Sequence, residues 1–339
     1  MGKKIWNVLL MFLNAVVALL LLFACLAPHI SSETRPVLSL FSLLVPFMLL
    51  ANIAFVIYWT FRFKKAVIFS ALSLLTAYFS IGSFYQFRTE HPSPVQEGLH
   101  VLSFNTRLFN KYQWSSNPYI AEQIITFVTE SGADIVAFQE FDVSYKDSFP
   151  SFPYRHISSG DNSQQAVQAI FSKYPMIHKG SIPFPSSTNT AIFSDIQIEK
   201  EVIRFYNVHL QSLRFSPNEV SSLDEEKRDR LYKRLKVSFA KQYSQAALVA
   251  AHKRDSPYRT ILCGDFNTNQ FSSVYYEIKD DDLDSFTESG SGFGKTLDFP
   301  YFPMRIDYIL SDPSMKFVSH KNYQLQLSDH YPVMATLHL

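Results

Sequence analysis

The chain has 339 residues, of which 47% are hydrophobic, and a formal net charge of +1. These averages combine two unlike parts, because residues 1–89 are almost entirely apolar and carry seven basic residues and one acidic residue. The remaining residues are numerous enough to bury a full core as one domain. Their 24 basic and 29 acidic residues argue against a dedicated DNA-binding domain, which is usually basic.

Three long apolar runs occupy the N-terminal part, at about residues 5–27, 37–61 and 66–85. Each is close to the length of about 20 apolar residues that crosses a bilayer, and none contains a charged side chain. Buried helices of a soluble protein usually keep a polar face, which these runs lack. We therefore predict a membrane anchor of three transmembrane helices in residues 1–89.

The basic residues predict the orientation of this anchor. Lys3 and Lys4 precede the first run, and Arg62, Lys64 and Lys65 lie between the second and the third. Positively charged residues stay on the cytoplasmic side of a membrane. We therefore expect a cytoplasmic N-terminus and an extracytoplasmic C-terminal part, which would be periplasmic if the protein is bacterial.

The first apolar run has two other interpretations, a cleaved signal peptide and a lipoprotein-type cleavage site ending at Cys25. The two apolar runs that follow argue against the first, and the bulky Phe23 argues against the second. The only other cysteine, Cys263, lies in a predicted strand. A pairing with Cys25 in a membrane helix is implausible, so we expect no disulfide.

After a proline-containing linker at residues 90–98, strands and helices alternate through residues 99–339. Asn117 and Pro118 favour a helix over 117–133, and acidic residues open a longer helix over about 222–251. Strands are predicted over 99–106, 134–141, 166–174, 190–198, 202–210, 258–266, 305–311, 316–324 and 331–339. The fourth and fifth of these suggest a hairpin. The pattern predicts a mixed α/β fold with two packed sheets flanked by helices.

The longer helix contains a basic stretch, residues 227–241, with seven basic side chains. Leu231, Leu235 and Phe239 recur within it at helical spacing, so the basic residues are expected to form the solvated face of a helix that packs on the core. The alternative is a surface that contacts phospholipid or nucleic acid. The sequence leaves both interpretations open.

Polar side chains stand at the ends of several predicted strands, or within them. Strand ends converge on one rim of a sheet, so these side chains are expected to lie together. They are Asn105, Glu140, His209, Asp265, Asn267, Asp307, Asp329 and His330. The carboxylates and amides are hard oxygen ligands that suit Mg²⁺ or Mn²⁺, and the histidines titrate near neutrality. This set of side chains is what phosphoryl transfer requires.

Six short motifs in this order carry a resemblance to a known family: SFNT, FQE, NVHL, GDFN, RIDYIL and SDHYPV. Over about residues 98–339 the sequence resembles the endonuclease/exonuclease/phosphatase superfamily of metal-dependent phosphoesterases. This superfamily includes deoxyribonuclease I-like nucleases, apurinic-site endonucleases, inositol-polyphosphate phosphatases and neutral sphingomyelinases. The resemblance implies a four-layer α/β sandwich and hydrolysis of a phosphodiester by in-line attack of water.

The resemblance also implies which residues bind the metal and the substrate. Glu140 would be the principal ligand of Mg²⁺ or Mn²⁺, with Asn105 and Asp329 close by. Arg107, Gln168 and Asn267 are expected to contact the substrate. Deoxyribonuclease I-like members have a glutamate, paired with their first histidine, on the strand that carries Gln168 here, so this histidine is expected to be less strongly activated.

The catalytic roles follow from the same resemblance. Asp265 would position or deprotonate the attacking water, and Asn267 would hydrogen-bond the phosphate. His330 would contact the phosphate and be oriented by Asp307. His209 would stabilise the developing charge or assist the leaving group.

The motifs define the scissile bond but not the groups around it. One hypothesis is a nuclease that acts outside the cytoplasm, and another is a phosphodiesterase or phosphatase for phospholipid or sphingomyelin-type head groups, which the anchor favours. A third, of a different class, is a non-catalytic scaffold subunit of a membrane complex. The sequence does not identify a protein partner.

Overall fold

The structure is a computed structural model that describes residues 2–26, 28, 30, 36–88, 97–158, 167–213, 224–300 and 302–339. The chain forms two compact units. One comprises Met1–Phe84, Ser222–Tyr243 and Asn269–Tyr276, and the other comprises Tyr85–Ser221, Ser244–Thr268 and Glu277–Leu339. Most of the predicted linker, residues 90–96, lies outside the described residues.

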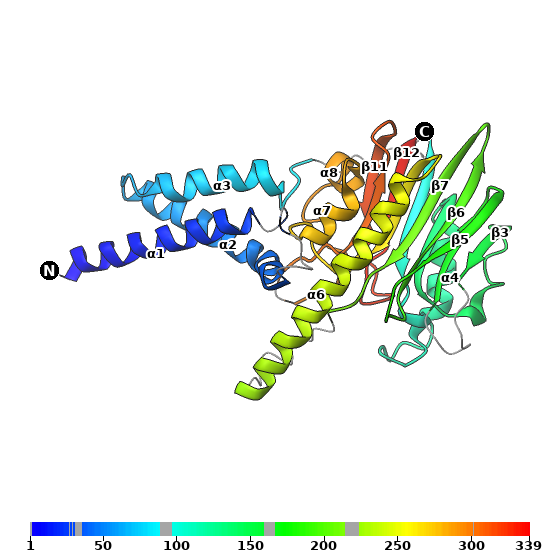
Figure 1. Ribbon diagram of the computed structural model, residues 1–339, viewed down its shortest axis with the longest axis horizontal. Helices are drawn as coiled ribbons and strands as arrows, with labels where there is room; N and C mark the ends of the chain where they lie inside the picture. The colour runs from blue at the N-terminus through cyan, green and yellow to red at the C-terminus, as the bar shows by residue number, and fades with distance from the viewer. Residues whose placement is uncertain are drawn as a thin grey trace. The chain divides into compact units, whose positions relative to one another are not determined.

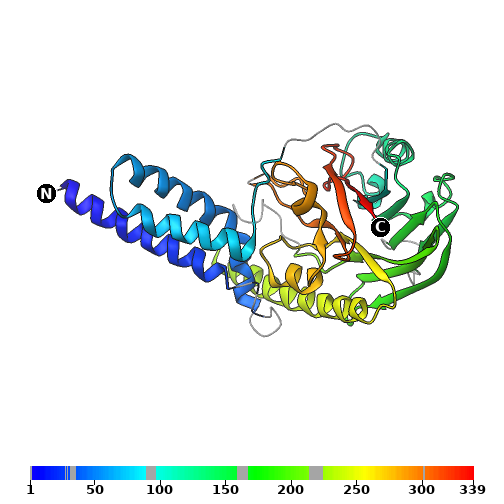
Figure 2. The ribbon, with the colours of Figure 1, turned by 90° about the horizontal axis from the view of Figure 1, so that it is seen from above.

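The first unit contains three apolar helices, α1 (Gly2–Ala24), α2 (Pro36–Phe61) and α3 (Val67–Ile81). Figure 2 shows them side by side, in blue to cyan. α1 and α2 are long and apolar enough to cross a membrane, whereas α3 has only 15 residues. At about 1.5 Å per residue, α3 is shorter than the ~30 Å hydrocarbon core. The prediction of three spans is therefore supported for two helices, and the third is shorter than predicted.

These helices expose apolar side chains and bury polar ones, which is the reverse of a soluble bundle. Ile5, Leu9 and Phe12 are exposed, as are many other large apolar side chains of the three helices. Asn14 and Asn52 are fully buried. Such a distribution suits an apolar surrounding, where backbone and amide groups must find partners inside the protein.

Two buried amides link the three helices. Asn14 of α1 donates to the carbonyl of Ala66 at 3.0 Å and accepts a hydrogen bond from the hydroxyl of Ser70 in α3. Asn52 of α2 accepts from the hydroxyl of Ser73 in α3 at 3.1 Å. α3 is therefore tied to both longer helices by specific hydrogen bonds rather than by apolar contact alone.

The second unit is built on two six-stranded mixed sheets. The first has the order β11-β12-β1-β2-β4-β3, and the second has the order β5-β6-β7-β8-β10-β9. Figure 1 shows β5, β6 and β7 side by side in green, with β11 and β12 of the other sheet in red. The strands of the first sheet are β1 (Leu99–Asn105), β2 (Ile135–Phe141), β3 (Tyr154–Ile157), β4 (Val167–Ser172), β11 (Lys316–Asn322) and β12 (Val333–His338). Those of the second are β5 (Met176–Pro183), β6 (Thr190–Ile198), β7 (Glu201–His209), β8 (Arg259–Asp265), β9 (Leu283–Asp284) and β10 (Asp307–Ser311).

Apolar side chains fill the space between the two sheets and beneath the helix α4 (Ile120–Glu130). The inter-sheet core combines residues of both sheets, such as Val101, Ile170, Ile192 and Ile261. A second, phenylalanine-rich core joins the first sheet to α4. Together with the C-terminal half of α6 (Glu225–Arg254), these layers form the sandwich of two sheets and flanking helices that the sequence predicts.

Most of the central strands lie where the sequence predicts them, and the differences concern edge strands and short helices. The hairpin of β6 and β7 is confirmed. The edge strands β3 and β5 lack a clear apolar alternation and were not predicted. The short helices α7 (Ser273–Lys279) and α8 (Ser285–Ser289) were also not predicted.

The predicted start of one helix was wrong, and the predicted start of another falls outside the described residues. α4 begins at Ile120 rather than residue 117, because the Asn117 side chain accepts a hydrogen bond from the backbone N–H of Tyr119 and closes a turn before the helix. α6 begins at Glu225, and residues 222 and 223 lie outside the described part of the chain.

The basic stretch 227–241 has the distribution expected of a helix that packs on a core. Leu235 and Phe239 are buried, while basic side chains such as Lys236 are exposed. Two basic residues near the helix start form ion pairs within the helix, Arg228 with Glu225 and Arg230 with Glu226. The interpretation as a solvated helix face accounts for these contacts without a ligand.

We predict that Gly264→Ala destabilises the fold more than the same substitution at a glycine that has no neighbouring atoms around an added Cβ. The residue has a φ of 143°, and an added Cβ would lie 1.9 Å from the carbonyl oxygen of Val208 on the neighbouring strand. The expected loss is more than about 2 kcal/mol of unfolding free energy, measured by denaturant unfolding of the full chain in detergent. In the control Gly132→Ala, φ is also positive but no atom is close, so only about 1 kcal/mol is expected. Equal losses would contradict the prediction.

Candidate active site

Strand register in the second sheet places three predicted site residues side by side. β7 and β8 are parallel, and His209 at the end of β7 pairs with Asp265 at the end of β8. β10 runs antiparallel to β8, and its first residue, Asp307, pairs with Asp265 from the other side. Asp265 therefore lies at the centre of a row of three because of backbone hydrogen bonding.

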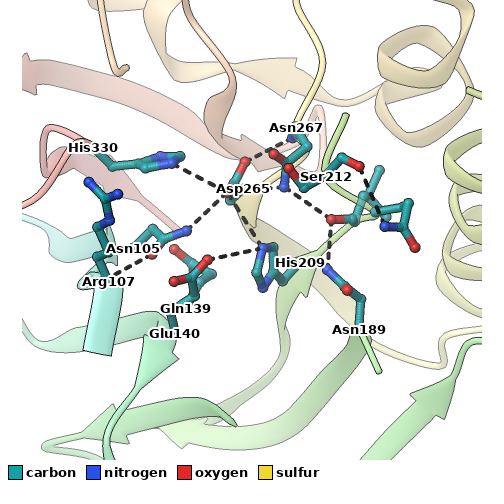
Figure 3. A network of polar contacts seen from close by, with 12 residues as sticks. Asn105, Arg107, Gln139, Glu140, Asn189, His209, Ser212, Asp265, Asn267 and His330 are labelled. Atoms are coloured by element: carbon teal, nitrogen blue, oxygen red, sulfur yellow. Dashed lines mark hydrogen bonds and ion pairs between the residues drawn. The ribbon is translucent and has the colours of Figure 1, made fainter. Parts of the chain in front are cut away.

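The first sheet contributes residues from the ends of β1 and β2. Asn105 is the last residue of β1, and its Nδ2 donates to Asp265 Oδ2 at 3.1 Å, which joins the two sheets. Glu140 lies in a β-bulge of β2 with a φ of 49°, a left-handed conformation that is uncommon in a strand. Bulges redirect side chains, and this one turns Glu140 toward the site. Figure 3 shows Asp265 between Asn105, His330, His209 and Asn267.

His330 is held between two carboxylates. Its Nδ1 lies 2.9 Å and 3.1 Å from the two carboxylate oxygens of Asp307. Its Nε2 faces Asp265 Oδ2 at 3.7 Å. All three side chains are buried. Asp307 therefore fixes the ring orientation, and Nε2 is left to face the centre of the site.

Burial and neighbouring charges shift the pKa values of this group. Burial disfavours the ionised form of Asp265 and raises its pKa to about 6, although the positive charge on His330 opposes the shift. Burial alone would lower the pKa of His330, but Asp307 and Asp265 outweigh it and raise the pKa to about 10. Between these values the site contains a carboxylate at Asp265 beside an imidazolium at His330.

His209 and Glu140 form the other side of the site. His209 Nε2 lies 3.6 Å from Asp265 Oδ2 and 4.0 Å from Glu140 Oε1. Burial lowers the pKa of His209, with the carboxylate of Asp265 acting in the opposite direction. Burial raises the pKa of Glu140, and the nearby Asp329 carboxylate contributes in the same direction. The two histidines are thus driven toward opposite charge states, His209 neutral and His330 positive.

Asn267 is fixed by the turn that follows β8. It has a φ of 52°, and its backbone N–H donates to Asp265 Oδ1 at 2.8 Å. Its side-chain Nδ2 donates to the carbonyl of Leu210 at 3.0 Å and to Asp265 Oδ2 at 3.2 Å. Asn189, which was not predicted, donates to the same Leu210 carbonyl at 2.8 Å (Figure 3). No sequence pattern pointed to Asn189, because it lies before β6 and meets the site only through the fold.

Tyr308 is a second residue that the sequence analysis did not single out. Its hydroxyl shares one proton between the carbonyls of Thr268 at 3.0 Å and Arg305 at 2.8 Å, and its ring stacks on Phe266 at a centroid distance of 4.7 Å. These contacts hold the residues on either side of Asn267. The tyrosine of the RIDYIL motif was the available signal for this role.

Arg107 begins an unusual turn beside the site. Arg107, Leu108, Phe109 and Asn110 all have positive φ, between 45° and 65°. Left-handed conformations of non-glycine residues are strained and occur most often at functional sites. The turn places the Arg107 guanidinium 3.2 Å from Asp329 and 5.0 Å from the ring centre of Trp114. Arg107 is partly exposed and thus presents a positive charge beside the partly exposed carboxylate of Asp329.

The side-chain atoms of one cluster are close enough together to hold a metal ion, but they are engaged with one another. Asp265, Asp307 and His330 offer ligand atoms within 4.8 Å of one another. The imidazole, however, contacts Asp307 through Nδ1, and the two carboxylates raise its pKa, which favours the form with both ring nitrogens protonated. A protonated imidazole has no lone pair for a metal. Hydrogen bonding and ion pairing account for this cluster.

The predicted ligands Glu140, Asn105 and Asp329 fit a hard cation better. They supply carboxylate and amide oxygens, which Mg²⁺ and Mn²⁺ prefer. The raised pKa of Glu140, with Asp329 contributing to it, indicates negative charge that the surrounding protein neutralises incompletely. Neither carboxylate side chain is fully buried, so a partly hydrated ion could approach.

The structure thus brings most of the predicted site residues together and places Gln168 beside them. Gln168 lies opposite the bulge that contains Gln139 and Glu140. It is buried, and within the described residues neither end of its side-chain amide has a hydrogen-bond partner. Gln139, in contrast, donates to Asn207 at 2.8 Å. Among the described residues, no hydrogen bond joins Gln168 to His209.

A family model described as the Endonuclease/Exonuclease/phosphatase family matches residues 102–330. The chain belongs to this family. Its members typically depend on a divalent metal. Residues 7–84 match a second family, a domain of unknown function (DUF8431). A comparison with curated proteins found no match.

Several solved structures share the fold. A mannosyl-6-phosphatase of Bacteroides thetaiotaomicron is 18% identical, with 71% of this chain and 100% of that chain covered and a TM-score of 0.53. Humanised D. rerio TDP2 is 14% identical, with 72% and 100% covered and a TM-score of 0.55. An endonuclease/exonuclease/phosphatase from Bacteroides vulgatus is 19% identical, with 72% and 100% covered and a TM-score of 0.54. At these identities the similarity establishes the sandwich fold alone.

We predict that Asp307→Asn lowers the pKa of His330 from about 10 toward its ordinary value, because the carboxylate that stabilises the imidazolium is lost. Histidine NMR of the full chain in detergent, titrated between pH 5 and 11, measures this shift directly. An unchanged His330 titration would show that Asp307 does not set its charge.

Proposed function

We propose that this protein is a membrane-anchored, divalent-metal-dependent phosphoesterase that hydrolyses a phosphoric ester by in-line attack of water. One observation carries the proposal above all others. Asp265 is buried between the oppositely tuned His209 and His330, and it accepts hydrogen bonds from Asn105 and Asn267. A buried carboxylate with a raised pKa next to hydrogen-bond donors has the properties of a general base.

The residues divide the work of the reaction between them. Asp265 orients and deprotonates the attacking water, since its raised pKa makes it a stronger base than an ordinary aspartate. His330, oriented by Asp307, presents an Nε2–H to a phosphoryl oxygen. The Asn267 side chain, which donates to Asp265 and to the Leu210 carbonyl, would turn one of these N–H groups to the phosphoryl group when substrate binds. His209, held neutral, stabilises the charge that develops on the leaving oxygen by donating an N–H hydrogen bond to it.

Glu140, Asn105 and Asp329 would hold Mg²⁺ or Mn²⁺, and the bound ion would neutralise charge on the phosphoryl group. Arg107, which is paired with Asp329 and lies over the Trp114 ring, adds a positive charge beside the proposed metal ligands. Gln168 is a further candidate for contact with the substrate, because its buried amide is unpaired among the described residues. A neutral amide here can donate to an ester oxygen as well as accept from a hydroxyl.

The anchor proposed for the enzyme consists of α1, α2 and α3. Only 22% of the residues in the apolar stretch of α1, and 28% of those in α2, are buried, which is too few for core helices of a soluble protein. Ser70 and Ser73 of α3 donate hydrogen bonds to buried amides of the two longer helices. These bonds support the proposal that α3 crosses the membrane together with α1 and α2. The basic residues then favour a cytoplasmic N-terminus and an extracytoplasmic catalytic domain.

The substrate class follows from the anchor and from charge more than from the relatives. The relatives differ in substrate, since one is named a mannosyl-6-phosphatase and D. rerio TDP2 was solved with a single-strand DNA product. The excess of acidic residues after residue 89 disfavours extensive contact with nucleic acid. We favour a phospholipid-type head-group phosphoester, with a nuclease as the second candidate. A non-catalytic scaffold would not need the ion pairs that tune Asp265 and His330.

We predict that Asp265→Ala and His330→Ala each lower kcat by at least about a hundredfold, because each removes a group that acts on the transition state. The measurement is Mg²⁺- or Mn²⁺-supplemented hydrolysis by the full chain in detergent. The substrates are a generic phosphodiester, plasmid DNA, RNA, sphingomyelin and phosphatidylinositol phosphates. Asp255→Ala, a change of the same type on the surface, is the matched control and should retain activity.

Full activity of either active-site variant on a retained fold would refute the assigned roles. Hydrolysis of lipid substrates with little action on DNA or RNA would support the head-group proposal. The reverse preference would favour the nuclease. Hydrolysis of none of these substrates, despite bound metal, would favour the scaffold.

We predict that kcat/KM rises with pH as Asp265 loses its proton and falls as His330 loses its own. A carboxyl with a pKa raised to about 6 is protonated, and inactive as a base, below that pH. An imidazole with a pKa raised to about 10 keeps its charge until the pH approaches that value. A bound cation lowers the first value, so the acidic limb is expected at or below about pH 6. A rate that falls between pH 5 and 8 would contradict this assignment.

A further inference from the structure

The residues that follow the catalytic motif pack with the anchor helices. Asn269–Tyr276 belong to the same compact unit as α1, α2 and α3. In the chain, only Thr268 separates this segment from Asn267. The segment, which we term the docking segment, is therefore attached directly to the residues proposed to carry out hydrolysis, and its last residues form the start of α7.

A proline in α2 makes the first docking contact available. Pro46 lies inside the helix, and because proline has no N–H, it cannot donate to the carbonyl of Ser42 one turn earlier. Asn269 Nδ2 donates to this carbonyl at 2.9 Å. Asn269 is buried, and its Oδ1 accepts from the backbone N–H of Phe271 at 3.1 Å. Both ends of the amide are thus used, one to satisfy the helix and one to shape the docking segment.

Phe271 supplies the second contact. Its side chain is 1% exposed and belongs to an apolar cluster whose other buried members come from the anchor helices. They are Leu21, Ala24, Cys25, Val45, Met48, Ala77 and Ile81. Its ring also lies 6.1 Å from that of Phe84. Phe271 therefore fills the end of the three-helix bundle as a core residue of the anchor.

We propose that Asn269 and Phe271 are positioning residues for the hydrolytic reaction. By docking on the anchor they restrain the chain that carries Asn267, so turnover depends on the folded anchor as well as on the active-site residues. This inference rests on the proposed hydrolytic function. It assigns the anchor a part in catalysis in addition to membrane attachment.

The test uses the full chain in detergent micelles with the phosphodiester substrate that the wild-type protein hydrolyses best. Asn269→Ala and Phe271→Ala are expected to lower kcat about tenfold, the effect of one lost buried contact, and to leave KM within about twofold. Phe271→Leu should recover most of kcat, because leucine fills much of the same volume. Phe317→Ala, a buried phenylalanine at the end of the first sheet opposite to Asn105, is the control that lowers stability without lowering kcat of the folded protein.

Pro46→Ala provides a test that leaves the docking segment unchanged. It restores an N–H that can donate to the Ser42 carbonyl, so Asn269→Ala in this background no longer leaves a buried acceptor unpaired. Asn269→Ala should therefore lower kcat by a smaller factor in the Pro46→Ala background than in the wild-type background. An equal loss in both backgrounds would show that the Asn269–Ser42 bond is not the basis of the effect.

Hydrogen exchange gives a readout that does not depend on activity. Backbone amides of residues 269–276 should be protected in the wild-type chain and lose protection in Asn269→Ala and Phe271→Ala. Unchanged protection in these variants overturns the proposal, even if no substrate is hydrolysed. If Asp265→Ala abolishes hydrolysis while Asn269→Ala and Phe271→Ala retain wild-type kcat, the docking proposal fails and the proposed function stands.

Discussion

The site depends on one buried carboxylate, that of Asp265, being surrounded by groups that the backbone holds in place. Strand pairing fixes His209 and Asp307 on either side of it, and the adjacent sheet supplies Asn105. Asp265 is fully buried, and its desolvation is partly offset by hydrogen bonds and by the imidazolium of His330. Removal of any of these partners leaves a costly buried charge, which explains why the surrounding turns are so constrained.

Backbone strain is concentrated in the same region. Glu140, Asn267 and Arg107 all have positive φ, and each sits where a strand ends or bulges. Such conformations cost free energy and persist only when surrounding contacts enforce them. Here the contacts are identifiable: the hydrogen bonds of Asn267 to Asp265 and Leu210, and the ion pair of Arg107 with Asp329. The orientation of these side chains is therefore maintained at a cost in stability.

From the sequence we could predict that polar side chains at strand ends meet in one site, but not which residues hold them in place. Alternating apolar runs with a polar residue at the end of each located Asn105, His209 and Asp265, because strand ends share one rim of a sheet. Asn189 and the left-handed turn after Asn105 depend on contacts between distant segments, which no local pattern encodes. The same reason applies to Asn269 and Pro46, whose relation appears only when the loop is seen against α2.

The most direct test of the account is a single-turnover hydrolysis in isotopically labelled water, comparing the wild-type chain with Asp265→Asn. Asparagine keeps the shape of Asp265 but cannot accept a proton. The account predicts that heavy oxygen from water enters the phosphate product in the first turnover, and that Asp265→Asn abolishes this incorporation while the protein remains folded. Label found in the alcohol product, or undiminished incorporation in Asp265→Asn, would contradict the central role of the buried carboxylate.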